Sequence, residues 1–356
     1  MYCQRCGAKL TATAGECVVC GQPVNRSGWR VAIAMLALMF MLLAAVIFLV
    51  ERQPTGTAVA SVVVPGEPEE PLAKQEAGAQ EFSNQEIAGP KPAERLSIAN
   101  MAEQVNPAEG FLLPAVLGDV GPKLLESGAI DYARFVQTYD RAGRPLTEEQ
   151  LAILTEGSDE PLVIDRENAY FLLNLLWAFG LTKRNVLLTE GPMMQYSEGD
   201  VGRFASTGGW TLGQRPATEL YSSAAMVTLT TEQQERLEAV AYGVYRPCCD
   251  NHTAFADCNH GMAMLGLLEL MAAQGATEDE MFAAAKHVNA FWFPQQAMES
   301  AVFFKAVMNL EYADVDGRMA AGPEVFSGSG FRAVHQWLAD NGKLEQAPNT
   351  GSGCGV

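Results

Sequence analysis

The densest group of reactive side chains in this sequence lies in residues 245–264, which read YRPCCDNHTAFADCNHGMAM. Three cysteines and two histidines fall within thirteen positions there: Cys248, Cys249, His252, Cys258 and His260. Thiolates and imidazoles together suit Zn²⁺ or copper, and a cysteine beside a histidine can also act as an activated nucleophile. Met262 and Met264 follow directly, and nearby thioethers favour Cu(I). The group therefore predicts a soft-metal site or a site of thiol redox chemistry.

A structural disulfide is the competing interpretation of these cysteines. Cys258 can pair with Cys248 or with Cys249, and the adjacent Cys248 and Cys249 can form a strained vicinal disulfide. An oxidising compartment favours such a bond, although it gives the two histidines no role. The alternative function is then a non-catalytic, disulfide-stabilised interaction or scaffold domain of a cell-envelope complex. The spacing matches no standard zinc finger, and no pattern in the sequence names a substrate for an enzyme.

Expected helix boundaries place one member of this group at a helix N-terminus. Pro247 is expected to end the preceding helix, and Asp257 or Asn259 to cap the following one. Cys258 or His260 would then lie in or beside the first turn, where unpaired N–H groups and the helix dipole stabilise a thiolate. A lowered thiol pKa at that position would favour both metal binding and nucleophilic reactivity.

A separate set of cysteines lies at the N-terminus, in two Cys-x-x-Cys-Gly pairs. Its members are Cys3, Cys6, Cys17 and Cys20. Each pair can offer two thiolates to one tetrahedral Zn²⁺. Residues 1–22 resemble the short zinc-ribbon module found at the N-termini of many prokaryotic membrane proteins. The resemblance implies a ribbon over residues 1–23 with a structural Zn²⁺ held by these four cysteines, and no open position for catalysis.

The segment between the two cysteine sets has the length and composition of a membrane span. Residues 31–50 read VAIAMLALMFMLLAAVIFLV without a charge, and about 20 helical residues cross a hydrocarbon core of about 30 Å. Trp29 is placed as an interfacial anchor, so we predict a transmembrane helix over residues 29–50. Four Lys or Arg residues precede the apolar run of residues 31–50, and only Arg52 follows it closely. The N-terminus is therefore expected in the cytoplasm of a prokaryote and the large domain outside its cytoplasmic membrane.

Composition divides the rest of the chain into three parts. Residues 51–96 are rich in proline and glutamate and poor in large apolar residues, which predicts a disordered tether. Residues 97–345 are long enough for a globular domain with a sizeable core, and residues 346–356, with Cys354, are expected to form a flexible tail. The net charge of −18 argues against nucleic acid as a partner and against tight contact with anionic lipid. The expected partners are the membrane, through the span, and envelope proteins.

Helical signals dominate the large domain, which is expected to be mainly all-α. Capping boxes are predicted to start helices at Thr231 and Thr277, and Pro294 to start another. Ser329 is predicted to cap the last helix. Strand signals are weak and confined to short pieces such as residues 226–230. The apolar segment 165–180 is too short to span a membrane and is interrupted by Asn174.

Overall fold

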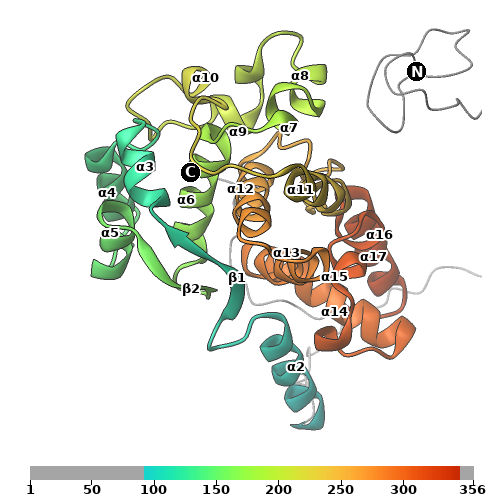
Figure 1. The fold of residues 1–356 in the computed structure, drawn as a ribbon. Coiled ribbons are helices and arrows are strands. Elements are labelled where there is room, and N and C mark those ends of the chain that lie inside the picture. The colour runs from blue at the N-terminus through green and yellow to red at the C-terminus, as the bar shows by residue number, and fades with distance from the viewer. Residues whose placement is uncertain (1–91, 345–356) are drawn as a thin grey trace, which may run out of the picture. The chain divides into compact units, whose positions relative to one another are not determined.

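The computed structural model describes residues 92–344, drawn in colour in Figure 1. The predicted zinc ribbon (1–23), transmembrane helix (29–50), most of the tether (51–96) and the tail (346–356) lie outside the described residues. No helix within residues 92–344 combines the length and the apolar character that crossing a membrane requires. The first described helix begins at Pro92, within the last residues of the segment predicted as a tether.

The described domain is mostly helical, as the sequence predicts. Its first half alternates helices with two strands: α2 (Pro92–Val105), β1 (Phe111–Gly118), α3 (Val120–Glu126), α4 (Tyr132–Arg141), α5 (Glu148–Thr155), β2 (Ser158–Ile164) and α6 (Ala169–Thr182). Short helices follow: α7 (Val186–Thr189), α8 (Pro192–Tyr196), η1 (Val201–Arg203), α9 (Ala205–Gly208) and α10 (Ala217–Leu220). The second half holds α11 (Thr231–Gly243), α12 (Asn259–Ala273), α13 (Glu278–Trp292), α14 (Pro294–Met308), η2 (Tyr312–Asp314), α15 (Gly317–Ala320), α16 (Pro323–Phe326) and α17 (Gly328–Asp340).

A two-stranded antiparallel sheet accompanies the helices, and the sequence did not place it. Strands β1 and β2 pair with Phe111 opposite Ile164 and Gly118 opposite Ser158. Burial alternates along β1, but almost every residue of its sequence, FLLPAVLG, is apolar, so the sequence shows no alternation that would reveal the strand. Residues 226–230, which carry one of the weak strand signals, are not a strand.

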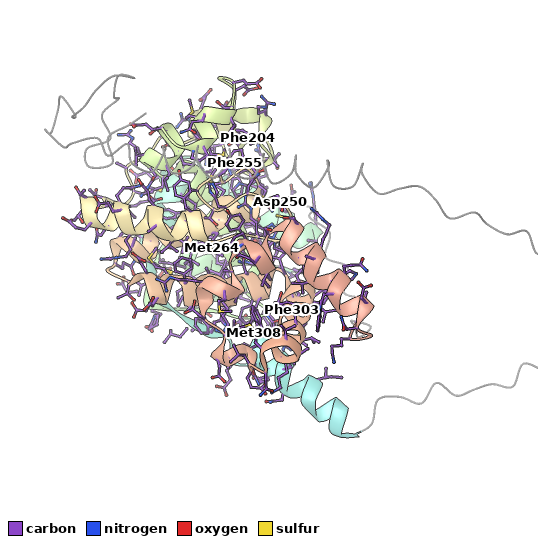
Figure 2. The ribbon with its side chains drawn as sticks, turned by 90° about the vertical axis from the view of Figure 1, so that its right-hand side faces the viewer. Phe204, Asp250, Phe255, Met264, Phe303 and Met308 are labelled. Atoms are coloured by element: carbon purple, nitrogen blue, oxygen red, sulfur yellow. The ribbon has the colours of Figure 1, made fainter. Side chains whose placement is uncertain are left out.

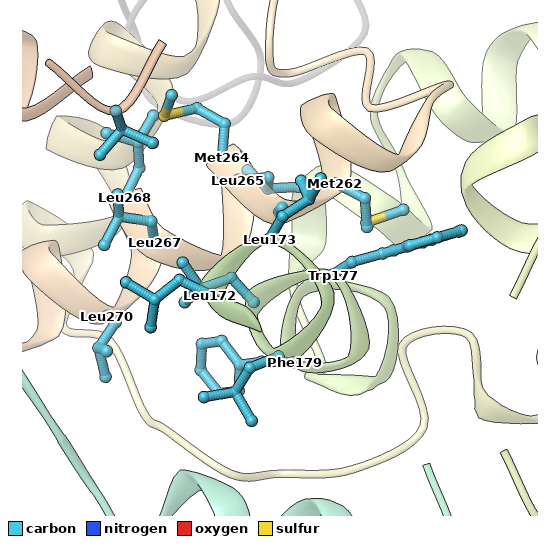
Figure 3. Packing of buried hydrophobic residues seen from close by; sticks show 14 of the residues in the cluster. Leu172, Leu173, Trp177, Phe179, Met262, Met264, Leu265, Leu267, Leu268 and Leu270 are labelled. Atoms are coloured by element: carbon cyan, nitrogen blue, oxygen red, sulfur yellow. The ribbon is translucent and has the colours of Figure 1, made fainter. Parts of the chain in front are cut away.

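Helices α6 and α12 pack against each other at the centre of the domain (Figure 3). Almost all of their side chains are buried, which explains why both sequences are apolar on every face. Gly180 and Gly266 allow the two backbones to approach closely, because a Cβ at Gly266 would lie 2.7 Å from the Leu176 carbonyl oxygen. Most of the apolar segment 165–180 therefore forms the buried helix α6. Asn174 within it donates to the Tyr139 hydroxyl at 2.9 Å.

Several predicted helix boundaries are confirmed and others shift by one or more residues. The capping box of Thr277 and Glu280 opens α13, and α14 begins at Pro294. The capping box of α11 is formed by Thr230 and Gln233, one residue earlier than predicted, because two adjacent threonines offered the same pattern.

The end of α11 and the start of α17 also differ from the predicted boundaries. Helix α11 ends at Gly243, before Pro247, because Tyr245 leaves the helix to donate its N–H to the Ala321 carbonyl at 2.8 Å. Helix α17 is capped by Ser327, whose side chain accepts the Gly330 N–H, and Ser329 lies in its first turn.

A smaller second core joins the last helices of the domain. Its buried residues come from α14 to α17 and include Phe304, Val325, Val334 and Leu338. Figure 1 shows these elements grouped at one side of α13, away from the α3–α5 group. The two helices that matter most for the site described below, α12 and α17, therefore belong to different cores.

The close contact of α6 with α12 predicts an unusual sensitivity to one methyl group. Gly180→Ala would press a Cβ onto the Met262 carbonyl oxygen, so we expect the free energy of unfolding to fall by about 2 kcal/mol or more. Gly143→Ala is the matched control: Gly143 has φ +68° and open space around it, and its substitution should cost about 1 kcal/mol. Urea unfolding measures the free energy of unfolding of both variants. An equal loss in Gly180→Ala and Gly143→Ala would contradict the close approach of α6 and α12.

Candidate thiol site

A buried arginine organises the loop between α11 and α12, which carries the cysteines. The Arg246 side chain is almost fully buried, and its Nη1 and Nη2 donate to the carbonyls of Asn251 and Phe255 at 3.1 and 2.9 Å. It also forms an ion pair with Asp257, whose other oxygen accepts from Asn251 Nδ2 at 2.8 Å. One guanidinium thus fixes three points of the loop, and the paired carboxylate makes its burial tolerable.

Cys258 occupies the N-cap of α12, where the sequence suggested Asp257 or Asn259. Its Sγ accepts the Gly261 N–H at 3.4 Å and the Nε–H of Arg246 at 2.9 Å. Gly261 has no side chain that could keep the guanidinium away, and a Cβ there would lie 2.5 Å from the Arg246 Cζ. The sulfur therefore faces a full positive charge and the positive end of a 15-residue helix.

The structure brings the three cysteines of the loop together as free thiols. Cys248 Sγ lies 3.7 Å from Cys258 Sγ, and the Sγ atoms of Cys248, Cys249 and Cys258 all lie within 4.8 Å of one another. Cys248 is exposed, whereas Cys249 and Cys258 are partly buried. Asp257 is not one of the converging ligands: its carboxylate is held by Arg246 and Asn251, and the Cys249 sulfur lies 4.0 Å from its Oδ1.

Negative charge in the group concentrates on one sulfur. Hydrogen bonds from the thiols of Cys248 and Cys249 hold the pKa of Cys258 well below its usual range, and the Arg246 charge and the Gly261 N–H act in the same direction. The same contacts raise the pKa of Cys248, which hydrogen-bonds to Cys249 and Cys258. Of the three sulfurs, Cys258 is therefore the one on which a negative charge is most favoured.

The two histidines of the loop point elsewhere. His252 packs its ring against Tyr242, with centroids 4.6 Å apart, and His260 packs against Phe293 at 4.5 Å. Neither imidazole belongs to the group of converging sulfur atoms. Burial, with the Arg246 charge, lowers the pKa of His252. Both rings are therefore neutral near pH 7 and serve as packing surfaces between the loop and its neighbours.

The methionines after the cluster also lie away from the sulfurs. Met262 and Met264 are buried in the main core, and Figure 3 shows both among the apolar side chains of α6 and α12. The thioether argument for copper therefore loses its structural basis, and the donor set consists of three thiols.

Helix α17 holds the loop through two main-chain N–H groups of its first turn. The Gly328 N–H donates to the Cys249 carbonyl at 2.7 Å, and the Ser329 N–H donates to the Asp250 carboxylate. A Cβ at Gly328 would lie 3.1 Å from the Cys249 backbone, so a glycine permits this close contact. Figure 2 shows Asp250 beside the helices of the C-terminal half, with Phe255 further along the loop near Phe204.

Arg246 and Gly328 are the site residues that sequence reasoning missed. A single arginine and a glycine before a helix carry no specific signal, because both are common in loops. The sequence indicated the cysteines and histidines of the loop, whereas the groups that hold the sulfurs come from 2 residues upstream of Cys248 and from a helix some 80 residues downstream. Only the fold shows that these segments meet.

A second buried polar group, also missed from the sequence, joins the end of α6 to α12. Lys183 and Glu269 form an ion pair in which each side chain is 1% exposed, and Asn185 also donates to Glu269. Burial lowers the pKa of Lys183 to about 7. A cavity of about 700 Å³ lies beside this group, lined by Asn185, Thr230 and Gln234 among others. The ion pair fixes α12 against α6 and makes no contact with the thiols.

No protein-family model matches this chain, and no curated protein or solved structure matches it significantly. The chemistry of the site is therefore argued from its own geometry.

The burial of His260 predicts a loss of stability in acid. Burial lowers its pKa to about 4, so between this value and about 6.5 the unfolded chain binds more protons than the folded one, and stability falls as the pH falls. Integrated to pH 4.5, this one residue costs about 2.5 kcal/mol. His260→Phe fits the same aromatic surroundings and should remove this part of the acid loss, while stability at pH 7.5 changes by less than about 1.5 kcal/mol.

Urea unfolding of both proteins at pH 7.5 and 4.5 measures the effect. An unchanged difference between the two pH values in His260→Phe would mean that the imidazole is not buried as the structure places it.

Proposed function

We propose that the helical domain binds one thiophilic metal ion, Zn²⁺ or copper, through Cys248, Cys249 and Cys258. The observation that carries the proposal is the spacing of the sulfurs. With metal–sulfur bonds of about 2.3 Å, two ligands lie about 3.8 Å apart in a tetrahedral site and about 4.0 Å apart in a trigonal one. The Sγ atoms of Cys248 and Cys258 are 3.7 Å apart, and all three sulfurs fit within 4.8 Å.

The charges around the sulfurs support the same function. A divalent ion would replace the thiol protons of Cys248 and Cys249, and three thiolates with Zn²⁺ would carry one net negative charge. Arg246 and the Gly261 N–H both donate to the Cys258 sulfur. Such N–H groups orient a ligating thiolate and offset its charge, which is the usual role of groups around the ligands of a metal site.

Three protein ligands leave room for a fourth from outside the chain. Structural zinc sites are normally closed by four protein side chains, whereas sites that exchange ligands or act on substrates keep one position open. Cys248 is exposed, so the open position would face solvent. This favours a domain that acquires and passes on an ion, or that holds one accessible to a small ligand, over a purely structural site.

Thiol–disulfide chemistry is the second candidate function, and one observation favours it. Cys258, the cysteine with the lowered pKa, lies with its sulfur 3.7 Å from the sulfur of the exposed Cys248. A disulfide between them would need the sulfurs to approach from 3.7 Å to about 2.05 Å, which is a small movement of an exposed residue. The same bond would serve the disulfide-stabilised interaction or scaffold domain of a cell-envelope complex, the alternative that the sequence also suggests.

The wider organisation of the protein is part of the proposal and rests on the sequence. The zinc ribbon of residues 1–23, with Cys3, Cys6, Cys17 and Cys20, would lie in the cytoplasm, and the helix of residues 29–50 would anchor the chain in the membrane. The helical domain would then handle its ion outside the cytoplasmic membrane, where envelope proteins are its expected partners and nucleic acid is not.

Metal content of the purified full-length chain tests the proposal. We expect two ions per chain by elemental mass spectrometry, one in the ribbon and one at the thiol group. Cys258→Ser should reduce the content to one ion, and the double variant Cys3→Ser/Cys6→Ser should remove the other. Cys354→Ser is the matched control and should leave both. A content that Cys258→Ser does not change would rule out the metal site in the helical domain.

A further inference from the structure

Two of the three sulfurs are arranged for oxidation as well as for metal binding. Cys258 Sγ receives hydrogen bonds from Arg246 and from the Gly261 N–H, which keep electron density on a sulfur that can attack an electrophile. The sulfur of Cys248 lies 3.7 Å away, and Cys248 is the exposed member of the group. An oxidised Cys258 would therefore find a second thiol close by, before any molecule from solution reached it.

The main chain of the loop distinguishes Cys248 from its neighbour Cys249. The Cys249 carbonyl accepts the Gly328 N–H at 2.7 Å, and the next residue, Asp250, accepts the Ser329 N–H, so this part of the loop is fixed to α17. Within the described residues, neither the N–H nor the carbonyl of Cys248 takes part in a hydrogen bond. Cys248 is therefore the thiol that can move the required distance of about 1.7 Å.

We propose that hydroperoxides oxidise Cys248 and Cys258 to a disulfide, and that this bond expels the metal ion and leaves Cys249 as the remaining thiol. The inference rests on the metal site proposed above and adds its regulation. A single cysteine ligand holds Zn²⁺ far more weakly than three, so formation of the disulfide releases the ion. The helical domain thereby becomes a site that gives up its ion in response to an oxidant.

The reaction balances with one hydroperoxide per disulfide. The Cys258 thiolate attacks the terminal peroxide oxygen, the O–O bond breaks, and the leaving hydroxide takes a proton to form water. The Cys248 sulfur then attacks the sulfur of the resulting sulfenic acid, the S–S bond forms, and the oxygen leaves as hydroxide, which takes a proton from solvent to form a second water. The two sulfurs together lose two electrons, hydrogen peroxide is reduced to two waters, and Zn²⁺ leaves in an unchanged oxidation state.

The rest of the loop is built to survive this reaction. Arg246 keeps its bonds to the carbonyls of Asn251 and Phe255 and its ion pair with Asp257 when Cys258 is no longer a thiolate. The Cys249 carbonyl remains bound to the Gly328 N–H of α17. The oxidised loop thus keeps most of its anchors, and a thiol reductant should restore the reduced site and its affinity for the ion.

The test uses the full-length chain with Cys3, Cys6, Cys17 and Cys20 changed to Ser, so that only the helical domain can bind Zn²⁺. The protein is loaded with Zn²⁺ and titrated with hydrogen peroxide, while a chromogenic chelator follows released zinc and peptide mass spectrometry maps disulfides. We expect one Cys248–Cys258 disulfide and one released Zn²⁺ for each peroxide consumed. Addition of dithiothreitol and its removal should restore one bound Zn²⁺ per chain.

Two adjacent cysteines provide the matched variants, which are oxidised without metal so that ligand loss does not interfere. Cys249→Ser should still form the Cys248–Cys258 disulfide. Cys248→Ser should lose that bond and accumulate a sulfenic acid at Cys258, which dimedone traps.

The possible failures are distinct. A chain that binds Zn²⁺ and keeps it, with its thiols still reduced after peroxide, would overturn the inference and leave the metal site standing. A disulfide between Cys249 and Cys258, in place of the one between Cys248 and Cys258, would also overturn the inference. A chain that binds no Zn²⁺ before peroxide is added would overturn the metal site, and metal release with it.

Discussion

The burial of one guanidinium within a short loop is the constraint on which the site depends. Arg246 cannot be removed from water unless its N–H groups find partners, and the loop folds so that two carbonyls, a carboxylate and the Cys258 sulfur supply them. The curvature that satisfies the guanidinium also brings the Cys258 sulfur to 3.7 Å from the Cys248 sulfur. Convergence of the sulfurs is thus a consequence of satisfying a buried cation.

The two cores hold this loop between them. Helix α12 belongs to the main core, where its contact with α6 fixes the position of Cys258 at the helix start. Helix α17 belongs to the smaller core and holds the main chain of Cys249 and Asp250. Cys248, between these anchors, is the most exposed of the three thiols. A rigid frame with one movable ligand suits a site from which an ion can leave.

Sequence patterns were informative where they reflect local rules. The capping box at Thr277, the helix start at Pro294 and the helical character of the domain follow from nearest neighbours along the chain. Local rules failed where tertiary contacts decide. Tyr245 leaves the α11 helix because a distant carbonyl binds it, and β1 is concealed because its outward residues are also apolar. The spacing of the cysteines in the sequence was enough to predict that their sulfurs cluster. The direction of each imidazole, however, depends on the aromatic side chains that surround it, and these come from α11, α13 and the turn before α14.

Gly261 has a consequence for how proteins of this kind can be identified. Its missing Cβ is the space that the Arg246 guanidinium fills, so the two residues are sterically interdependent across 15 positions of sequence. Any larger residue at 261 would displace the guanidinium, and with it the partner of the Cys258 sulfur. Homologous chains that keep the thiol group should therefore show these two positions covarying. The pattern Arg-x-Cys-Cys, followed after eight residues by Cys-x-x-Gly, is a compact signature with which to search for them.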